Sequence, residues 1–300
     1  MDKKRKVRKK MSNHNEIVAD WYTDHWEPGF KQWWKGYETL GLHEALYEKN
    51  TKNFEEGLLN MNNFVGRLLG LKEKQSAKIL DAGCGVGGTS IYLGNKFKNV
   101  QFTGITITPK QVIWANKFAA ERNFNRNVNF LLKSYLDTGF PDGYFDAAFA
   151  LESVSYAINK RAFTKEMSRI LKTGGRLVVI APTILKPDMN EWMKRIYELD
   201  YLGRGDPIFP ILEELKTYLK EEEFKQIETI NLSKNIYRSE VRSFILSIPF
   251  MFSVFAKSIF NRRKYDPSKD IDYYLAVGFL SPIMGLSGTA GYYAITAIKK

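Results

Sequence analysis

The sequence predicts an α/β protein: a doubly wound, mostly parallel sheet of seven strands, with a helical segment before it and a helical insertion before the last strand. Three observations indicate this fold. From residue 77 onward, short apolar runs alternate with helical patterns, as in parallel sheets. The first run, residues 77–83, is continuously apolar up to its acidic end, which is typical of a strand buried on both faces. Four glycines then fall within six positions, where the chain turns into a helix.

The remaining elements follow in order from their patterns. Pro109 begins a helix, because proline fits the first helical turn. A glycine pair at 174–175 closes the helix that begins at residue 160. The expected strands cover residues 77–83, 100–108, 128–134, 145–153, 176–182, 225–233 and 291–300; the expected helices cover 89–97, 109–123, 160–175 and 207–224.

The chain is expected to divide into five segments around this sheet. Residues 234–288 separate the last two strands and are too many for a hairpin, so they form an insertion with helices of its own. The segment before the sheet is rich in aromatic residues and helical in pattern. The expected segments are a disordered basic tail or tag at 1–12, a helical lid at 13–72, the core at 73–232, the insertion at 233–289 and the final strand at 290–300.

The formal charge of +12 does not indicate a nucleic-acid partner once it is located. The first ten residues hold seven Lys or Arg and one Asp, so half of the net charge lies in a tail that resembles a nuclear-localisation peptide. The one cysteine, Cys84, excludes an internal disulfide and fits a reducing compartment. No apolar secretory start follows the basic opening, so a cytoplasmic location is expected.

The glycine-rich turn after the first strand predicts a ligand site, because it lets backbone N–H groups and a helix N-terminus approach a bound molecule. The register "GCGVGG" fits a dinucleotide loop at Gly83, Gly85 and Gly88, whereas the lysine of a Walker loop is absent. Asp81 precedes these glycines and would repel a pyrophosphate. An acid there suits a ligand with an ammonium group and hydroxyls, although Asp81 as a plain strand-end cap remains open.

Four segments, in order, resemble the class I S-adenosylmethionine-dependent methyltransferases. "ILDAGCGVGG" is similar to the first motif of that family, and "FTGITITPKQVIWAN" resembles a stretch of its tocopherol and cyclopropane-forming branch. "LHEALYEKNTKNFEEGLLNMN" and the block from "FPDGYFDAAFALESVSYA" to "LKTGGRLVV" resemble segments of the sterol and tocopherol C-methyltransferases. The resemblance spans about residues 22–182. It implies S-adenosylmethionine as the cofactor.

The resemblance also implies which residues bind that cofactor. Gly83 and Gly85 would shape the turn around the methionine part, with Asp81 attracting its ammonium group. Thr106 and Gln111 would contact the ribose and the adenine side, although an ordinary strand residue and a helix-surface residue are open alternatives. The expected contacts also include Tyr22 (or plain helix packing), Cys84, Leu151, and Ser134 with Tyr135, where Ser134 replaces the acid that many relatives carry.

Glu152 is the best candidate for a catalytic base or charge stabiliser. It ends the fourth strand, at the edge where such sheets bind ligands, and it matches the Glu of the family's W-S-x-E-S motif. A structural acid that pairs with a buried Arg or a backbone amide remains the alternative. The sequence from Glu152 is "ESVSYA", whereas relatives often have a second acid and a His there. Tyr156 is therefore expected either to take a polar role or only to pack against its neighbours. His43, without other ligands at suitable spacing, indicates no metal.

The insertion indicates a hydrophobic partner. Uncharged residues run from Ser243 to Ala256, interrupted by Pro249, which is too short for a membrane span. The segment can line a pocket for a lipid-like substrate, lie on a bilayer surface, bury itself in a homodimer contact, or form a helical cap without a lipid role.

The leading prediction is therefore an enzyme that methylates a hydrophobic small molecule, on carbon of an isoprenoid, sterol or quinol-type acceptor. N- or O-methylation of a small amine or hydroxyl compound is the alternative. A nucleic-acid methyltransferase is disfavoured, because the N/D-P-P-Y/F motif of the base-amino enzymes is replaced here by "LESVSY". A binding protein without catalysis is disfavoured by the intact glycine loop.

Overall fold

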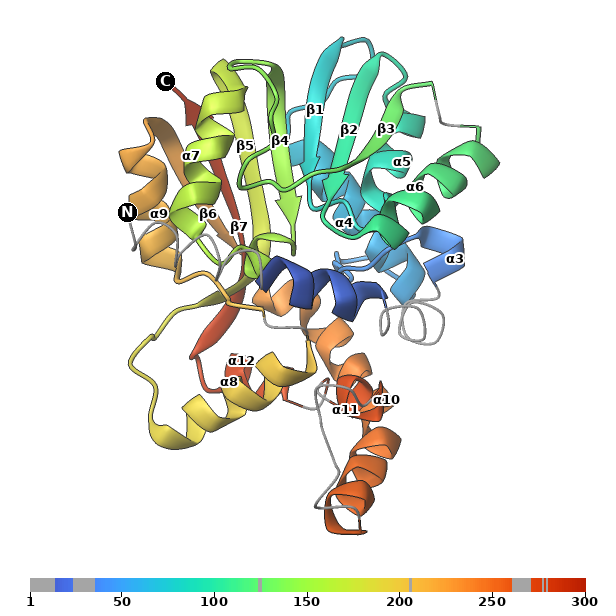
Figure 1. The fold of residues 1–300 in the computed structure, drawn as a ribbon, viewed down its shortest axis with the longest axis vertical. Coiled ribbons are helices and arrows are strands. Elements are labelled where there is room, and N and C mark those ends of the chain that lie inside the picture. The colour runs from blue at the N-terminus through green and yellow to red at the C-terminus, as the bar shows by residue number, and fades with distance from the viewer. Residues whose placement is uncertain are drawn as a thin grey trace.

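A seven-stranded sheet forms the centre of the computed structural model, which describes residues 14–23, 36–123, 126–204, 207–260, 271–276, 278 and 280–300 (Figure 1). The strand order is β3-β2-β1-β4-β5-β7-β6. The strands are β1 Ala77–Ala82, β2 Val100–Thr106, β3 Val128–Leu132, β4 Phe145–Leu151, β5 Leu171–Ile184, β6 Phe224–Asn231 and β7 Ala290–Lys299.

The pairing confirms the predicted fold class. β3, β2, β1, β4 and β5 run parallel, and β7 lies antiparallel between β5 and β6. The helices are α3 Gly36–Thr39, α4 Phe54–Leu68, α5 Gly88–Lys96, α6 Pro109–Glu121, α7 Lys160–Ile170, α8 Glu191–Gly203, α9 Leu212–Glu221, α10 Ser233–Phe260, α11 Ile271–Ala276 and α12 Ser281–Leu286, with a short 3-10 turn at Val154–Tyr156 and a helix over residues 14–23.

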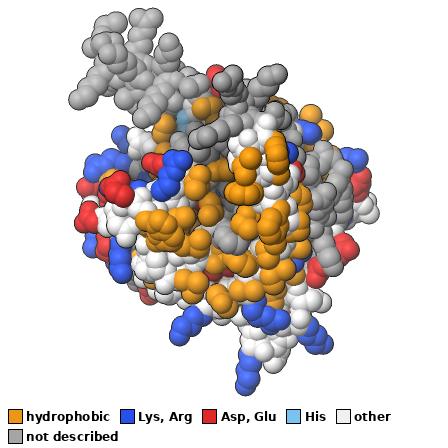
Figure 2. Space-filling view, turned by 90° about the horizontal axis from the view of Figure 1, so that it is seen from below, with side chains coloured by type: hydrophobic (Ala, Val, Ile, Leu, Met, Phe, Trp, Pro, Cys, Tyr) orange, Lys and Arg blue, Asp and Glu red, His pale blue; other side chains and the backbone are white. Residues whose placement is uncertain are grey.

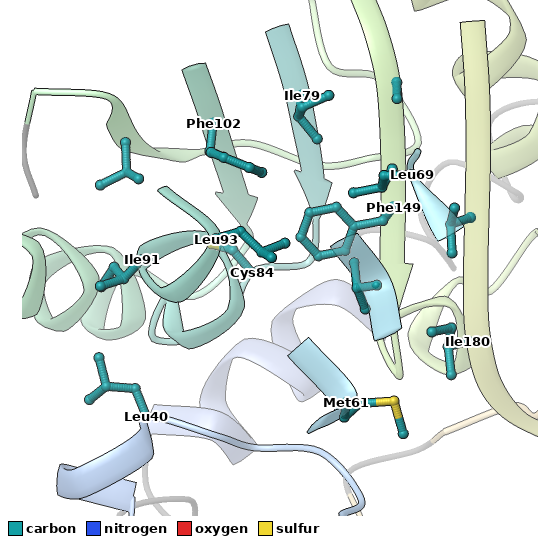
Figure 3. Packing of buried hydrophobic residues seen from close by; sticks show 14 of the residues in the cluster. Leu40, Met61, Leu69, Ile79, Cys84, Ile91, Leu93, Phe102, Phe149 and Ile180 are labelled. Atoms are coloured by element: carbon teal, nitrogen blue, oxygen red, sulfur yellow. The ribbon is translucent and has the colours of Figure 1, made fainter. Parts of the chain in front are cut away.

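The two faces of the sheet bury separate clusters, because successive strand residues point to opposite sides. Ile79 packs on the face that α4, α5 and α6 cover, together with Phe102 and Phe149 (Figure 3). Leu80, the next residue, packs on the face that α7 and α9 cover. The carboxyl ends of the parallel strands therefore meet at one edge. Figure 1 shows the helix over residues 14–23 crossing that edge, with α8, α10, α11 and α12 beyond it.

Two expected boundaries are wrong. The helix expected over 160–175 ends at Ile170, because Leu171 takes an extended conformation and pairs with Phe145 at the start of β5. Pro249 does not interrupt the insertion: α10 continues through it for 28 residues. Proline removes a single helical hydrogen bond, and Pro249 is exposed, so the kink is tolerated. By length and composition alone, the continuous helix is long and apolar enough to cross a membrane. The uncharged run from Ser243 to Ala256 by itself is too short to do so.

Candidate active site

The glycine turn after β1 has a backbone that strongly favours glycine. Gly83, Gly85 and Gly87 have φ values of +99°, +52° and +84°, in the left-handed region. A Cβ on Gly83 would overlap the side chain of Ser153, and one on Gly88 would overlap the carbonyl of Leu40. The turn therefore lies against the segment after β4, and the start of α5 lies against Leu40.

A cavity opens over this turn at the carboxyl ends of β1, β2 and β4. The structure brings together there nearly all of the residues that the sequence singled out. Ser134 is the exception: its Oγ accepts a hydrogen bond of 3.2 Å from the amide of Leu136, outside this lining. The predicted residues that line the cavity are Tyr22, Asp81, Gly83, Cys84, Gly85, Thr106, Gln111, Tyr135, Leu151, Glu152 and Tyr156.

Asp81 is the acid at the centre of the cavity floor. It is 3% exposed and accepts a hydrogen bond of 2.7 Å from the hydroxyl of Ser90, a residue that the sequence reasoning missed. Burial raises the pKa of Asp81 to about 7, and the Ser90 hydrogen bond opposes that rise. A ligand ammonium group would supply the positive charge that this carboxylate lacks.

Two further observations fit a polar cofactor here. The hydroxyl of Ser155 lines the cavity, is buried, and has no hydrogen-bond partner among the described residues. Thr106 donates a hydrogen bond of 2.7 Å to Oε1 of Gln111, and both side chains are buried in the wall. Gln111 is 3% exposed, which rules out a helix-surface position for it.

Aromatic rings close the cavity on the side of the helix over residues 14–23. The Tyr22 and Tyr156 rings meet edge to face at 5.4 Å, and the Tyr156 hydroxyl donates to the carbonyl of Arg204 at 3.0 Å. Burial raises the pKa of Tyr156 to about 12. Tyr135 donates to the carbonyl of Ser153 at 3.0 Å. Of the other expected lid aromatics, Trp21 packs against Tyr22, whereas Trp26, Phe30, Trp33, Trp34 and the Tyr37 side chain lie outside the described part.

A second cavity of about 490 Å³ lies between the sheet edge and the insertion. It shares Glu152, Pro182, Arg204 and Phe209 with the first cavity, so the two adjoin at these residues. Most of its remaining lining comes from α10, α12 and β7, and includes Ile236, Tyr237, Pro282, Met284, Leu286, Ala290 and Tyr292.

Glu152 stands at the junction in a sharply turned backbone. Its φ of +59° is unusual for a residue with a side chain, and such positions cluster at functional sites. Its Oε1 accepts hydrogen bonds from the amide of Glu44 at 2.7 Å and the hydroxyl of Tyr292 at 2.5 Å. The backbone amide foreseen as a structural partner is thus present. Burial raises the pKa of Glu152, against the pull of these hydrogen bonds.

Several charged residues at the junction escaped sequence reasoning, because no motif marks them. Burial and the Glu152 charge raise the pKa of Glu44 to about 7, and its carboxylate accepts a hydrogen bond from Ser239. Arg204 and Asp200 form an ion pair at 2.8 Å. Glu240 on α10 lines the second cavity, and burial raises its pKa to about 8.

His43 is buried and lines the first cavity. Its Nε2 lies 3.1 Å from Oδ1 of Asn62, and its Nδ1 lies 3.1 Å from the carbonyl of Glu44. Among the described residues, no group of three or more His, Cys, Asp or Glu side chains has an arrangement that could hold a metal ion.

Comparisons with known proteins agree with this geometry. Residues 80–179 match the methyltransferase-domain family. A probable chloroplastic tocopherol O-methyltransferase of Oryza sativa subsp. japonica is 36% identical over 139 residues, which cover 43% of this chain and 38% of that protein. The chain thus spans less than half the length of this curated relative.

Two solved structures show the same fold over nearly the whole chain. The cyclopropane synthase MmaA2 of Mycobacterium tuberculosis has a TM-score of 0.78 at 18% identity, covering 95% of this chain and 98% of its own. The geranyl diphosphate C-methyltransferase of Streptomyces coelicolor A3(2) has a TM-score of 0.71 at 17% identity, covering 96% and 98%. Residues 80–179 therefore match a methyltransferase domain, and the chain as a whole has the fold of these two structures.

Proposed function

We propose that the chain transfers a methyl group from S-adenosylmethionine to a hydrophobic small molecule held in the second cavity, with carbon of an isoprenoid, sterol or quinol-type lipid as the acceptor atom. One observation carries the proposal: Glu152 lines both cavities. A carboxylate at that junction is within reach of any atom that passes from one cavity to the other. Similarity to a tocopherol O-methyltransferase supports a quinol-type or isoprenoid acceptor, with a hydroxyl oxygen as the alternative acceptor atom.

The first cavity has the groups that the cofactor requires. Asp81 would bind the ammonium group, the glycine turn would admit the methionine part, and Thr106 with Gln111 would meet the ribose and adenine side. When bound, the cofactor supplies an electrophilic methyl group. The half-buried rings of Tyr22 and Tyr156 beside it would exclude water from the transfer.

The charge of the second cavity restricts the acceptor. Glu44, Glu152, Asp200 and Glu240 line it, against Arg204 and Lys234. Burial raises the pKa of Glu44 to about 7 and that of Glu240 to about 8, so part of this excess of carboxyl groups is neutral at pH 7. The ionised part would repel a phosphate or diphosphate ester. The apolar lining on α10 and α12 suits hydrocarbon. We therefore infer an acceptor without phosphate groups.

The same carboxyl groups suit methylation at an alkene carbon. Attack by the alkene leaves positive charge on the acceptor, which a nearby carboxylate stabilises. Loss of a proton from an adjacent carbon then completes the reaction, and Glu152 is placed to accept that proton. Its raised pKa brings its proton affinity closer to neutral pH, where a base works best.

N-methylation of a hydrophobic amine is the second candidate, and the carboxyl excess also favours it. Glu240 and Glu44 would attract a protonated amine into the cavity. The amine must lose a proton before it can attack, and Glu152 would accept it. A labelled product distinguishes the two candidates by the atom that carries the new methyl group.

The test begins with calorimetric titration of S-adenosylhomocysteine into the full chain. We expect micromolar binding that Asp81→Asn abolishes, whereas Asp137→Asn, an exposed acid outside both cavities, leaves it unchanged. Labelled methyl donor is then offered with prenyl, sterol, quinol and hydrophobic amine acceptors. Glu152→Gln should lower turnover about 100-fold while cofactor binding stays within twofold. Binding without transfer to any of these classes would contradict the proposed acceptor.

A further inference from the structure

The insertion carries a stripe of exposed apolar side chains along α10, here called the α10 stripe: Tyr237, Ile245, Phe252, Phe255 and Ile259. Their exposed fractions lie between 48% and 65%. At 3.6 residues per turn, their spacing places them on one side of the helix, within an arc of about 80°. Figure 2 shows hydrophobic side chains gathered on the end of the molecule that is seen from below, where the insertion lies.

The opposite side of α10 is attached to the fold. The helix packs against α11, α12 and β7. Asp272 on α11 accepts hydrogen bonds from Ser253 at 2.5 Å and Lys257 at 2.8 Å, and Ile236 and Ser239 are buried near the sheet. A helix that spans a bilayer would expose these polar partners to lipid. The arrangement therefore leaves the α10 stripe exposed on the other side of the helix.

The α10 stripe is continuous with the mouth of the second cavity. Tyr237, at one end of the stripe, lines that cavity and is 48% exposed. Leu286 on α12 also lines it and is 76% exposed. Two apolar side chains thus reach from the cavity wall to the outer surface, on the side where the stripe begins.

The charge of α10 indicates what covers this surface. The helix holds four basic side chains, Lys234, Arg238, Arg242 and Lys257, and one acidic side chain, Glu240. Asp272 neutralises Lys257, so the remaining side chains carry a net charge of +2. An amphipathic helix with apolar and basic groups lies in the interface of an anionic bilayer, held by its buried apolar area and by the surface potential.

We propose that the α10 stripe docks in the plane of an anionic lipid surface and places the mouth of the second cavity against the bilayer. A lipid-like acceptor then enters the cavity without crossing water. This last step rests on the proposed function. Docking of the stripe does not.

Vesicle flotation tests the docking with the full chain and phosphatidylglycerol–phosphatidylcholine vesicles. We expect the wild type to float with these vesicles and to float at least fivefold less with phosphatidylcholine alone. Phe252→Glu/Phe255→Glu should reduce binding to the mixed vesicles at least tenfold. Ile259→Glu should weaken it, whereas Ile113→Glu, at an even more exposed isoleucine on α6, should not.

Calorimetry with S-adenosylhomocysteine on the same proteins shows that each variant is folded and keeps its cofactor site. Equal vesicle binding by wild type and the Phe252→Glu/Phe255→Glu variant would overturn the proposal. So would a wild-type dimer in sedimentation that this variant converts to monomer without any vesicle binding, because the stripe would then be a subunit contact. If the wild type does not bind S-adenosylhomocysteine, the proposed function is overturned, but the docking result is unaffected.

Discussion

The hydroxyl of Tyr292 donates a hydrogen bond of 2.5 Å to Oε1 of Glu152, across 140 residues of sequence. The bond ties the antiparallel strand β7 to the end of β4, at the junction of the two cavities. The amide of Glu44 donates to the same oxygen at 2.7 Å. Oε1 therefore accepts hydrogen bonds from both the Tyr292 hydroxyl and the Glu44 amide. We expect the other carboxylate oxygen of Glu152, Oε2, to face the acceptor.

Tyr292→Phe should move the acid limb of the pH–rate profile to higher pH. The hydroxyl stabilises the Glu152 carboxylate and lowers its pKa, so its loss raises that pKa and leaves less of the basic form at a given pH. Turnover with saturating acceptor, measured between pH 5 and 9, checks this. Tyr293→Phe, whose hydroxyl accepts from Asn231, serves as the control. An unchanged acid limb would show that Glu152 is not the titrating base.

Binding of S-adenosylhomocysteine should weaken as the pH falls below about 7. Burial raises the pKa of Asp81 to about 7, so at lower pH the free protein holds a neutral acid that must lose its proton to meet the ammonium group. The expected slope approaches a tenfold loss of affinity per pH unit, with a proton released on binding. Calorimetry in buffers of different ionisation enthalpy measures both quantities. A flat affinity between pH 5.5 and 7 would contradict the assignment of Asp81.

Gly83→Ala should cost more stability than Gly174→Ala and abolish cofactor binding. Both glycines have positive φ, at +99° and +77°, so both substitutions strain the backbone by about 1–2 kcal/mol. Only at Gly83 does the added methyl group overlap another side chain, that of Ser153; around Gly174 the space is open. Urea unfolding compares the two costs. Equal losses of unfolding free energy in the two variants, with cofactor binding retained by Gly83→Ala, would show that the glycine turn rearranges to accommodate the added methyl group.

Arg204→Leu should destabilise the fold by about 3 kcal/mol, because it leaves the buried carboxyl of Asp200 without its ion-pair partner. The Arg204→Leu/Asp200→Leu variant should recover most of that loss. Arg195→Leu, on α8 like Asp200 but in an exposed pair with Glu198, should cost less than about 1 kcal/mol. Free energies of unfolding in urea report all three. No recovery in the double variant would show that Arg204 acts on other groups.

The sheet and the cofactor side were predictable because the signals there are local. β1, the glycines and Asp81 are adjacent in sequence. The position of the glycines between a strand pattern and a helix pattern indicates that the backbone turns sharply there. Thr106 and Gln111 are five residues apart and were found through the family's motif. Ser134 was misplaced, since a strand pattern does not tell which way the following turn directs its side chain.

The acceptor side was not predictable, because its residues come from segments far apart. Glu44, Arg204, Glu240 and Tyr292 line one cavity with Glu152 in a fold that places β7 between β5 and β6. The full length of α10 was not predicted, because Pro249 was expected to interrupt the apolar segment.

The most direct test of the account is a crystal structure of the full chain with S-adenosylhomocysteine. We predict the ammonium group at Asp81 and the thioether sulfur directed towards Glu152, with the 490 Å³ cavity open beyond it. A sulfur atom directed away from that junction, or a ligand bound elsewhere, would contradict the assignment of the two cavities.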